Sequence, residues 1–514
     1  MANKISFKES NILSKLSSDY LENPDSFVDF ISQIPKIENF EKQIQNRQPV
    51  NRDVLYSVLK NQNQNCHINS QKNIELIKEK TTFTVTTGHQ IGLFTGPLYS
   101  IYKIISTINL AKELKEKYSQ YNFVPVFWMA TEDHDFEEIN HVHLFDKKIT
   151  WDTNQKGPVG RFSTQDISPF LDAINETISS EFAKIISDFY FNSSNLADAH
   201  RKMVDFIFGE YGIVIIDADS KELKREMIPV FKNELLNPKT FEAVEELSEK
   251  LIEKGYKKQV NPREINLFYQ ENGLRERIIR SGNGFEVVNT DISFAEDEIL
   301  NELENFPEKF SPNVVMRPMY EEKILPNLAY IGGPGEIAYW LQLKDGFTVN
   351  GIDFPILVLR NSVLLIEEKT KRKISKLPFE INDYFKNEDE LINSYINKVS
   401  EISFEEEIKS IEKIFEITKE KAVEVDFSLE RTVIAELKRA QNSINKIKKK
   451  VTKAEKNNNS VAVNQIKSIK NSFFPAGSFQ ERRKNIVEFY EPDLIKFLID
   501  NLIILEDNIT LMQL

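Results

Sequence analysis

Runs of apolar residues alternate with apolar residues at helical spacing in the larger, N-terminal part of the chain. The β-branched run FTVTT, from Phe83, stops at Gly88, and helical spacing then extends from Leu98 to Tyr118. A second apolar run, FVPVFWMA, follows at residues 123–130. This order of strand, helix and strand predicts a parallel βαβ unit with a right-handed crossover.

A third apolar run, YGIVIIDAD at residues 211–219, ends in two aspartates. Ser220 follows it as the predicted N-cap of one helix, Lys221 to Leu236. Further apolar runs lie between residues 255 and 375: EINLFY, FEVVN, NVVMRP, FPILVL and SVLLIE. Strands and helices that alternate in this way predict an α/β fold with a Rossmann-like, largely parallel sheet as its core.

The pattern changes from about residue 384 to 472, where glycine is absent and Lys, Glu and Asn dominate. Apolar or small residues follow heptad spacing in two stretches: Phe404, Ile408, Ile411, Phe415, Thr418, Ala422 and Val425, then Val433, Leu437, Ala440, Ile444, Ile447, Val451 and Ala454. With a turn near residues 426–428, these stretches predict an antiparallel helical hairpin, a coiled-coil arm able to pair with a second subunit. The amphipathic tail, residues 485–514, is expected to pack back on the main body.

These changes of pattern suggest how the chain is divided. We expect N-terminal helices and the first half of the core in 1–145, an inserted connecting segment in 146–200, and the second half of the core, with insertions, in 201–375. A helical coiled-coil hairpin is expected in 376–472, followed by a C-terminal segment, 473–514, that packs on the core.

Composition narrows the class of protein. Hydrophobic residues make up 40% and charged residues 28% of the 514 residues, which is typical of a soluble globular protein. The net charge of −13 argues against a nucleic-acid partner, which requires a basic face. No apolar stretch approaches membrane-spanning length, and the N-terminus lacks an apolar signal core, so we expect no membrane partner and a cytoplasmic location. The single cysteine, Cys66, excludes an intrachain disulfide.

The loop between the first predicted strand and helix contains Gly88, Gly92 and Gly96, although glycine is rare in this chain. Glycines allow backbone N–H groups to approach a ligand, and a helix N-terminus favours negative charge. His89 and Gln90 add side chains able to contact a phosphate or a reacting carboxylate. The spacing matches neither common nucleotide-binding motif, so an anion loop and an ordinary strand-to-helix turn remain equal alternatives.

A polar quintet, residues 131–135 (TEDHD), directly follows the second predicted strand. Ligands of open α/β sheets bind beyond the carboxyl ends of the strands, so this quintet should lie beside the Gly88 loop. Carboxylates beside an imidazole suit acid–base catalysis, binding of an amine or coordination of Mg²⁺. His141 and His143, together with His134 or Asp135, also allow a metal site, although surface histidines are the simpler interpretation.

Two further groups end predicted strands. Asp217 and Asp219 could contact a ribose, a metal or an amine, or could be turn and capping residues. The turn Gly332–Glu336 offers backbone donors and a carboxylate at the start of a helix that continues through Leu341. We expect three turns, those of Gly92, His134 and Gly335, to meet in one pocket at the carboxyl edge of a single sheet.

Four segments, in order along the chain, carry a family resemblance. They are TTGHQIGLFTGPLYSIYK at 86–103, PVFWMATEDHDFEEINH at 125–141, SPNVVMRPMYEEKILPNLAYIGGPGEIAYW at 311–340 and FFPAGSFQERRKNI at 473–486. Together they resemble the cysteine-adding enzymes of bacillithiol biosynthesis, the BshC cysteine ligase family. The resemblance implies a Rossmann-like core with inserted connecting segments, a helical coiled-coil arm and a homodimer formed through that arm.

The resemblance also implies an activity. The carboxyl of cysteine would be joined to the amine of glucosaminyl malate, and the likeness of the core to class I aminoacyl-tRNA synthetases implies activation by ATP, with Mg²⁺ as a second expected cofactor. The residues expected to act in catalysis are His89, Gln90, Glu132, Asp133 and His134. Those expected to bind the cofactor are Gly88, Gly92, Gly96 and Asp217. Those expected to bind substrate are Asp135, Asn140, Gly332, Gly333, Gly335 and Glu336.

Two other functions remain open from the residues alone. One is a metal-dependent hydrolase that uses His134, Asp135, His141 and His143. The other is a non-enzymatic scaffold in which the coiled-coil arm is the working part.

Overall fold

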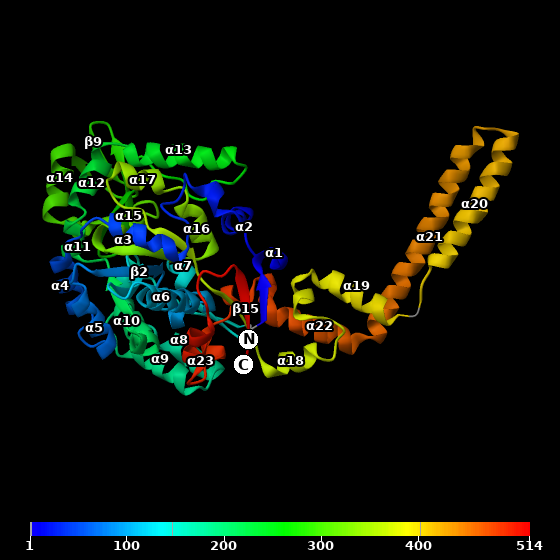
Figure 1. Cartoon of the computed structure of the whole chain (residues 1–514), viewed down its shortest axis with the longest axis horizontal. Helices are drawn as coiled ribbons and strands as arrows, with labels where there is room; N and C mark the ends of the chain where they lie inside the picture. The colour runs from blue at the N-terminus through cyan, green and yellow to red at the C-terminus, as the bar shows by residue number, and fades with distance from the viewer. Residues whose placement is uncertain (1–2, 146, 401) are drawn as a thin grey trace. The chain divides into compact units, whose positions relative to one another are not determined.

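The computed structural model describes residues 3–145, 147–400 and 402–514 (Figure 1). The chain divides into two compact units, one of Met1–Leu364 and Phe479–Met512 and the other of Leu365–Ser478 and Gln513–Leu514. No helix within these described ranges combines the length and the apolar character needed to cross a membrane.

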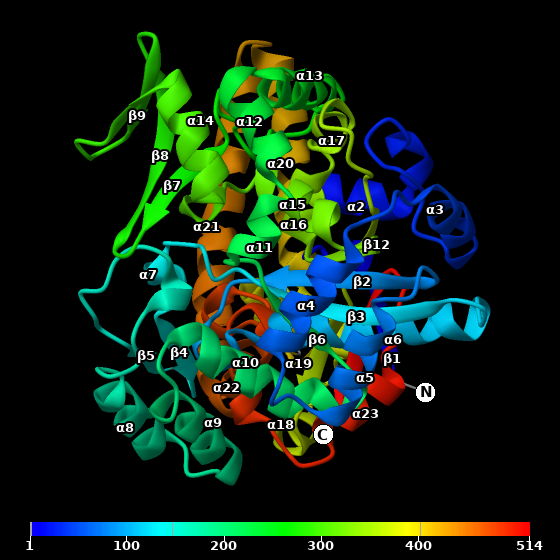
Figure 2. The ribbon, with the colours of Figure 1, turned by 90° about the vertical axis from the view of Figure 1, so that its left-hand side faces the viewer.

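A five-stranded sheet forms the centre of the first unit (Figure 2). Its order is β13–β12–β2–β3–β6, and each neighbouring pair is parallel. Its strands are β2 (Thr82–His89), β3 (Asn122–Met129), β6 (Val214–Asp217), β12 (Asn327–Gly332) and β13 (Ile356–Leu359). Helix α6 (Leu98–Lys117) connects β2 to β3, so the predicted βαβ unit is confirmed.

Strands β2 and β3 are buried at nearly every residue, because parallel strands have both faces covered. Helix α6 is also mostly buried, since α23 (Leu494–Asn501) packs against it. Asn109 donates from its side chain to the carbonyl oxygens of Ile499 and Leu502, at 3.0 and 2.7 Å. The C-terminal tail therefore packs on the main body, as predicted.

The prediction of one continuous helix from Lys221 to Leu236 is wrong. The structure has two helices, α11 (Lys221–Arg225) and α12 (Ile228–Leu236), with Ser220 as the N-cap residue of the first. Pro229 lies in the first turn of α12. Proline has no N–H to donate and fits only a first turn, so the chain begins a new helix there.

The first unit also contains an antiparallel sheet, of order β10–β9–β8–β7–β11. Its strands are β7 (Leu267–Glu271), β8 (Leu274–Ser281), β9 (Gly284–Val287), β10 (Ser293–Ala295) and β11 (Phe310–Pro312). The runs EINLFY and FEVVN belong to this sheet, so their assignment to a largely parallel sheet was wrong. Gly273 and Gly282, with φ of 78° and 56°, lie in two-residue turns that can join only antiparallel neighbours.

Two other runs also differ from the prediction. NVVMRP is not a strand: Asn313 Oδ1 accepts from the backbone N–H groups of Val315 and Met316, where α15 (Met316–Ile324) begins. SVLLIE forms β14 (Ser362–Ile366), which belongs to a separate three-stranded sheet with β1 (Asn3–Ser6) and β15 (Asn508–Gln513).

Other elements of the first unit belong to the N-terminal region and to the connecting segments. The helices are α1 (Phe7–Ser10), α2 (Lys15–Glu22), α3 (Phe40–Asn46), α4 (Arg52–Gln62), α5 (Ile68–Leu76), α7 (Phe136–Ile139), α8 (Ser168–Thr177), α9 (Glu181–Phe191), α10 (Leu196–Phe208), α13 (Lys239–Glu253) and α14 (Glu296–Asn305). A short antiparallel hairpin consists of β4 (His141–Leu144) and β5 (Lys147–Thr150).

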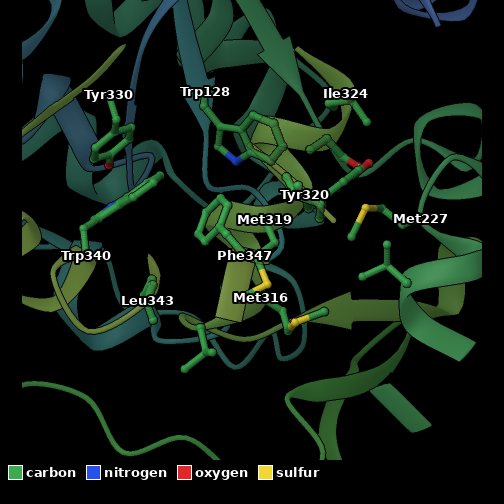
Figure 3. Close-up of a cluster of buried hydrophobic side chains, with 14 of the residues drawn as sticks. Trp128, Met227, Met316, Met319, Tyr320, Ile324, Tyr330, Trp340, Leu343 and Phe347 are labelled. Atoms are coloured by element: carbon green, nitrogen blue, oxygen red, sulfur yellow. The ribbon is translucent and has the colours of Figure 1, made fainter. Parts of the chain in front are cut away.

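A cluster of large buried side chains fixes α15, α16 (Pro334–Trp340) and α17 (Lys344–Val349) against the parallel sheet (Figure 3). Trp128 of β3 meets Tyr320 edge to face, with ring centroids 5.3 Å apart. Tyr330 of β12 stacks on Trp340 at 4.3 Å. The second contact holds the last residue of α16 against the strand that precedes the helix.

The second unit contains α18 (Glu368–Ile374), α19 (Glu388–Val399), α20 (Glu405–Val425), α21 (Leu429–Asn458) and α22 (Ser460–Phe473). Helices α20 and α21 pack side by side as a hairpin, so the predicted arm and its turn at residues 426–428 are confirmed (Figure 1). Neither helix contains a fully buried residue. The hairpin alone therefore leaves its apolar seam only partly covered.

Candidate active site

A cavity of about 980 Å³ opens at the carboxyl edge of the parallel sheet. Three segments distant in sequence line it: Gly88–Gln90 at the end of β2, Trp128–His134 at the end of β3, and Gly333–Glu336 at the start of α16. The antiparallel sheet contributes Phe268 and Arg275 to the lining. The turns of His134 and Gly335 thus meet in one pocket, as the rule for open α/β sheets requires, but the first loop contributes Gly88–Gln90 and not the expected Gly92.

At the end of β2, the imidazole of His89 lies edge to face with the ring of Tyr99, at 5.1 Å between centroids. Burial, with Lys103 nearby, lowers the pKa of His89 to about 3. The imidazole is therefore neutral at physiological pH and brings no positive charge to the cavity. Gly88, beneath it, has Arg317 Nη1 3.5 Å from where a Cβ would stand.

Gly92 and Gly96 are buried and lie outside the cavity lining. Their turn is closed by the C-terminal segment: Asn485 Nδ2 donates to the carbonyl oxygens of Phe94 and Gly96, at 2.7 Å each. The first N–H of α6, on Leu98, donates to a backbone carbonyl 2.8 Å away in the same segment. The N–H groups of Gly92 and Gly96 donate to carbonyl oxygens within the turn, at 2.9 Å each, so the donors expected to hold a phosphate here are already used.

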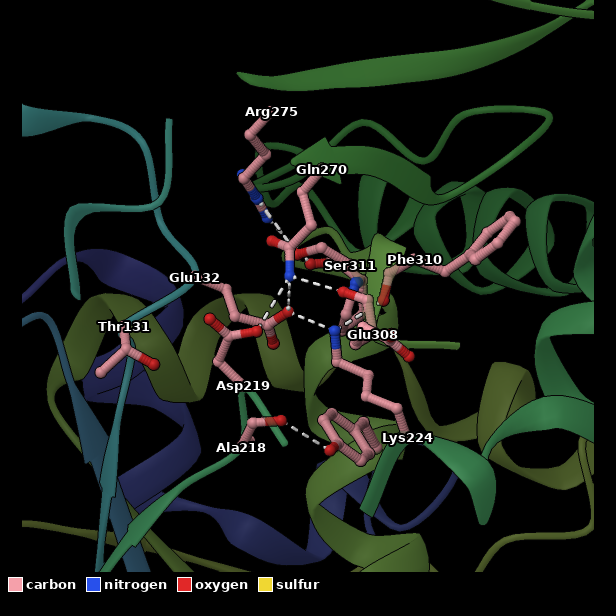
Figure 4. A network of polar contacts seen from close by, with 12 residues as sticks. Thr131, Glu132, Ala218, Asp219, Lys224, Gln270, Arg275, Glu308, Phe310 and Ser311 are labelled. Carbon is pink, nitrogen blue, oxygen red and sulfur yellow. Dashed lines mark hydrogen bonds and ion pairs between the residues drawn. The ribbon is translucent and has the colours of Figure 1, made fainter. Parts of the chain in front are cut away.

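Glu132, at the end of β3, is held in a polar network (Figure 4). Lys224 Nζ donates to Glu132 and also to the carbonyl oxygen of Phe310, and Gln270 Nε2 donates to Glu132 at 3.2 Å. Burial raises the pKa of Glu132, while the Lys224 ammonium opposes that rise. Glu132 is therefore occupied by fixed partners, which suits a structural link between elements better than proton transfer.

Asp133 and Glu138 face each other across Gln90. Gln90 Nε2 donates to Asp133 Oδ2 at 2.9 Å and to Glu138 Oε2 at 2.7 Å. Burial alone would raise the pKa of Asp133, but the hydrogen bond from Gln90 and the charge of Arg275 hold it below its usual value. The cavity therefore contains an ionised carboxylate, and no lysine or arginine among the described residues is in direct contact with it.

His134 has a defined tautomer. Arg275 Nη1 lies 2.8 Å from His134 Nδ1, and arginine can only donate, so Nδ1 accepts and Nε2 carries the proton. The guanidinium of Arg275 is itself fixed by Ser311 Oγ and the carbonyl oxygen of Pro312, at 3.1 Å each. His134 can therefore donate a hydrogen bond through Nε2.

Three aspartates, Asp135, Asp217 and Asp219, lie outside the cavity lining. Asp217 is a hydrogen-bond acceptor for Thr131 and for the backbone N–H of Asp219, and burial raises its pKa. Asp219 pairs with Arg161 at 2.7 and 2.8 Å. Asn140 also lies outside the lining and contacts a neighbouring histidine.

At the start of α16, Glu336 binds three donors. Lys103 Nζ lies 2.6 Å from Oε2, the Tyr330 hydroxyl donates to Oε1 at 2.6 Å, and the Gly333 N–H donates to Oε2 at 2.8 Å. Burial would raise the pKa of Glu336, but Lys103 and these donors lower it to about 2. Lys103 also donates to the carbonyl oxygen of Gly88, so it joins the turns after β2 and β12.

The sequence analysis missed Glu138, although it lies in the segment PVFWMATEDHDFEEINH, and it missed the arginines of the lining. They are Arg263, Arg275, Arg277, Arg317, Arg360 and Arg482. Two signals could have found some of them. Arg275 and Arg277 occupy alternate positions of a strand and so share one face. Arg482 lies in the segment FFPAGSFQERRKNI, already singled out by the family resemblance.

Nothing in the structure supports the metal site. His141 and His143 have ring centroids 5.2 Å apart, and burial together with Arg483 lowers the pKa of His143 to about 4. Within residues 3–145, 147–400 and 402–514, no group of three or more His, Cys, Asp or Glu side chains is placed to hold a metal ion.

Matches to known proteins cover nearly the whole chain. Residues 1–361 match the family model "Bacillithiol biosynthesis BshC, N-terminal Rossmann-like domain", and residues 363–514 match "Bacillithiol biosynthesis BshC, C-terminal coiled-coil domain". A protein from Flavobacterium johnsoniae named "Putative cysteine ligase BshC" is 45% identical, with 99% of each chain covered. Proteins of the same name from Flavobacterium psychrophilum and Cytophaga hutchinsonii are 46% and 40% identical, each over 95% of this chain and 94% of its own.

Proposed function

Since the chain belongs to the BshC family of bacillithiol biosynthesis, we propose that it is a ligase that joins the carboxyl group of cysteine to the amine of glucosaminyl malate. The observation that carries this proposal is the convergence of the turns after β2, β3 and β12 on one cavity with both cationic and acidic walls. Such a cavity can hold a zwitterionic amino acid beside anionic substrates.

A free carboxylate has no good leaving group, and ATP, when bound, supplies one. The cavity wall at the start of α16 suits a phosphate chain. Arg360 and Arg482 line the cavity there beside Gly333 and Gly335, and the buried Arg360 Nε has no hydrogen-bond partner among the described residues. This wall fits phosphate better than Gly92 and Gly96, which lie outside the cavity.

The residues after β3 suit the amino-acid substrate. Asp133, ionised and open to the cavity, would bind the ammonium group of cysteine. Glu138, the more exposed carboxylate beside Gln90, would accept the proton that the attacking amine loses. His134 would donate through Nε2 to the oxygen that gains charge as the amide forms. Mg²⁺ stays a proposed partner of ATP, for which the described side chains offer no ready-made cluster.

Two wider features belong to the same proposal. The partly covered seam of α20 and α21 suits pairing with a second copy of the chain. The proposed location is the cytoplasm, where cysteine and ATP are available.

The activity is tested by incubating the purified protein with ATP, cysteine and glucosaminyl malate and identifying the products by mass spectrometry. We expect the amide product only when ATP is present, and the released nucleotide, AMP or ADP, identifies the bond that is cleaved. Absence of the amide with folded protein would reject the proposal.

Asp133→Asn tests the ammonium site. Loss of the carboxylate charge should raise the KM for cysteine about tenfold, because a charge-assisted hydrogen bond is lost. Asp135→Asn is the matched control, since Asp135 lies two residues away but outside the cavity lining. Equal KM values for the two variants would contradict the assignment.

A further inference from the structure

The face of the antiparallel sheet that lines the cavity presents arginines from β8. Arg277 pairs across the strands with Phe268, and Arg275 with Gln270. Side chains of directly paired residues share one face of a sheet, and Phe268, Arg275 and Arg277 all line the cavity. Arg277 is exposed to the cavity, whereas Arg275 is buried and fully engaged with fixed acceptors.

A second exposed arginine stands on a fixed backbone just before β7. The N–H of Arg263 donates to Asn266 Oδ1 at 3.0 Å, and Asn266 Nδ2 donates to the carbonyl oxygen of Arg263 at 2.8 Å. Asn266 is buried and donates from both its side chain and its backbone to Glu234 Oε1, at 2.8 Å each. The position from which the Arg263 side chain extends is therefore determined before any ligand arrives.

Arg263 and Arg277 differ from Arg317 and Arg360 in having no carboxylate partner among the described residues. Arg317 pairs with Glu321 at 2.6 Å, and Arg360 pairs with Glu481 at 2.6 Å. Within the described part of the chain, no ion pair or side-chain hydrogen bond engages the guanidinium of Arg263 or Arg277. Arg482 has no such partner either within those residues, but it lies with Arg360 near Pro334, on the wall formed by the start of α16. In a chain with net charge −13, the uncompensated charges of Arg263 and Arg277 point to an anionic ligand.

We propose that Arg263 and Arg277 form a subsite for a dicarboxylate, and that this subsite binds the malyl group of the acceptor. The inference rests on the proposed function, which supplies an acceptor with two carboxylates. Guanidinium groups bind planar carboxylates in bidentate fashion, and two arginines match two carboxylates. Phe268, which pairs with Arg277 across the strands, also lines the cavity. Its ring offers an apolar surface to the carbon atoms that join the two carboxylates.

The same chemistry could serve the phosphates of ATP, but the arrangement favours the acceptor. Arg277 lies in β8 of the antiparallel sheet, and Arg263 lies just before β7 of the same sheet. Arg360 and Arg482 belong to other elements and line the cavity together with the Gly333–Gly335 turn. Two separate cationic groups allow a phosphate chain and a dicarboxylate to be held at the same time, as a reaction between activated cysteine and the acceptor requires.

The test measures binding by calorimetry with the full-length protein, so that it does not depend on catalysis. The ligands are glucosaminyl malate, methyl glucosaminide, which lacks carboxylates, and a non-hydrolysable ATP analogue. For Arg263→Gln/Arg277→Gln we expect glucosaminyl malate to bind at least about tenfold more weakly than to the wild type. Binding of the other two ligands should stay unchanged. In the wild type, methyl glucosaminide should bind at least about tenfold more weakly than glucosaminyl malate.

Arg280→Gln is the matched control, because it removes a positive charge from the same strand outside the cavity. Melting temperatures of all variants verify that they fold. Unchanged binding of glucosaminyl malate to the double variant would overturn the subsite, as would equal binding of both sugars to the wild type. Weaker binding of the ATP analogue alone would assign the arginines to phosphate and also overturn it. Arginine-dependent binding without any ligation would support the subsite while rejecting the proposed ligase activity.

Discussion

At the residue scale, two buried lysines fix the positions of acidic residues in the cavity wall. Lys103 binds the Glu336 carboxylate and the carbonyl oxygen of Gly88, and Lys224 binds the Glu132 carboxylate and the carbonyl oxygen of Phe310. Both lysine side chains are completely buried. Each lysine therefore neutralises one acidic residue of the site and ties it to the backbone of a different element, so these carboxylates hold the walls in place.

The Lys103–Glu336 pair predicts a specific dependence of stability on pH. The pKa of Glu336 falls from an ordinary 4.5 to about 2 on folding, so its contribution is complete above pH 4.5 and is lost as the pH falls towards 2. Glu336→Gln should therefore lower the Tm at pH 7, and the Tm difference from the wild type should shrink steadily below pH 4.5. Differential scanning calorimetry between pH 3 and 7 checks this. A Tm difference that is constant over that range would contradict the pairing.

At the scale of elements, the Lys224 network joins the parallel and the antiparallel five-stranded sheets of the first unit. It begins at the end of β3 and at α11, and it reaches β7 through Gln270 and β11 through Phe310 (Figure 4). Gln270 Nε2 also donates to Asp219, beyond β6, at 3.0 Å. The wall that carries Arg275 and Arg277 is thereby fixed to the edge of the parallel sheet where the predicted chemistry takes place.

Lys224→Met should loosen that wall, because it leaves Glu132 buried without its cation. We expect a loss of about 3 kcal/mol in the free energy of unfolding and faster amide exchange in β7 and β11, measured by hydrogen–deuterium exchange. Lys221→Met, in the same helix, is the control: Lys221 and its partner Glu308 are about one-third exposed, so its loss should cost about 1 kcal/mol or less. Similar exchange in both variants would show that the Lys224 network does not anchor the sheet.

At the scale of the whole molecule, the arm carries apolar side chains that its own hairpin does not cover. Ile414 of α20 and Ile434 of α21 are 60% and 52% exposed, and neither belongs to the predicted heptad seam. Single exposed apolar residues are common, but here they accompany a seam without one fully buried residue. This combination supports the proposed pairing of the arm with a second copy.

Ile414→Lys/Ile434→Lys should weaken that pairing. Burying two ammonium groups in an apolar interface is unfavourable, so we expect the dimer Kd to rise about tenfold or more, measured by sedimentation equilibrium. Thr432→Lys adds a charge at an exposed polar position of α21 and should leave the Kd unchanged. A wild-type protein that is monomeric at micromolar concentration would contradict the proposal.

Local patterns alone predicted the βαβ unit of β2, α6 and β3, the adjacent third strand β6 and the hairpin of α20 and α21. These features depend on periodicity, which neighbouring residues encode. The meeting of the Gly88, Asp133 and Gly335 turns was also predictable, because the carboxyl ends of parallel strands share one edge. The antiparallel sheet could have been recognised from the dipeptide Asn272-Gly273, a strong hairpin signal.

Only the tertiary structure decided which of the candidate groups are free to act. Glu132 is occupied by a lysine 92 residues away in the chain, and the Gly96 turn by an asparagine 389 residues away. Arg263 and Arg277 line the cavity because β7 and β8 fold against the edge of another sheet. Partners that are distant in sequence leave no local pattern, so a residue's chemistry can be predicted from its type, while its burial and its partners follow from the packing of the whole chain.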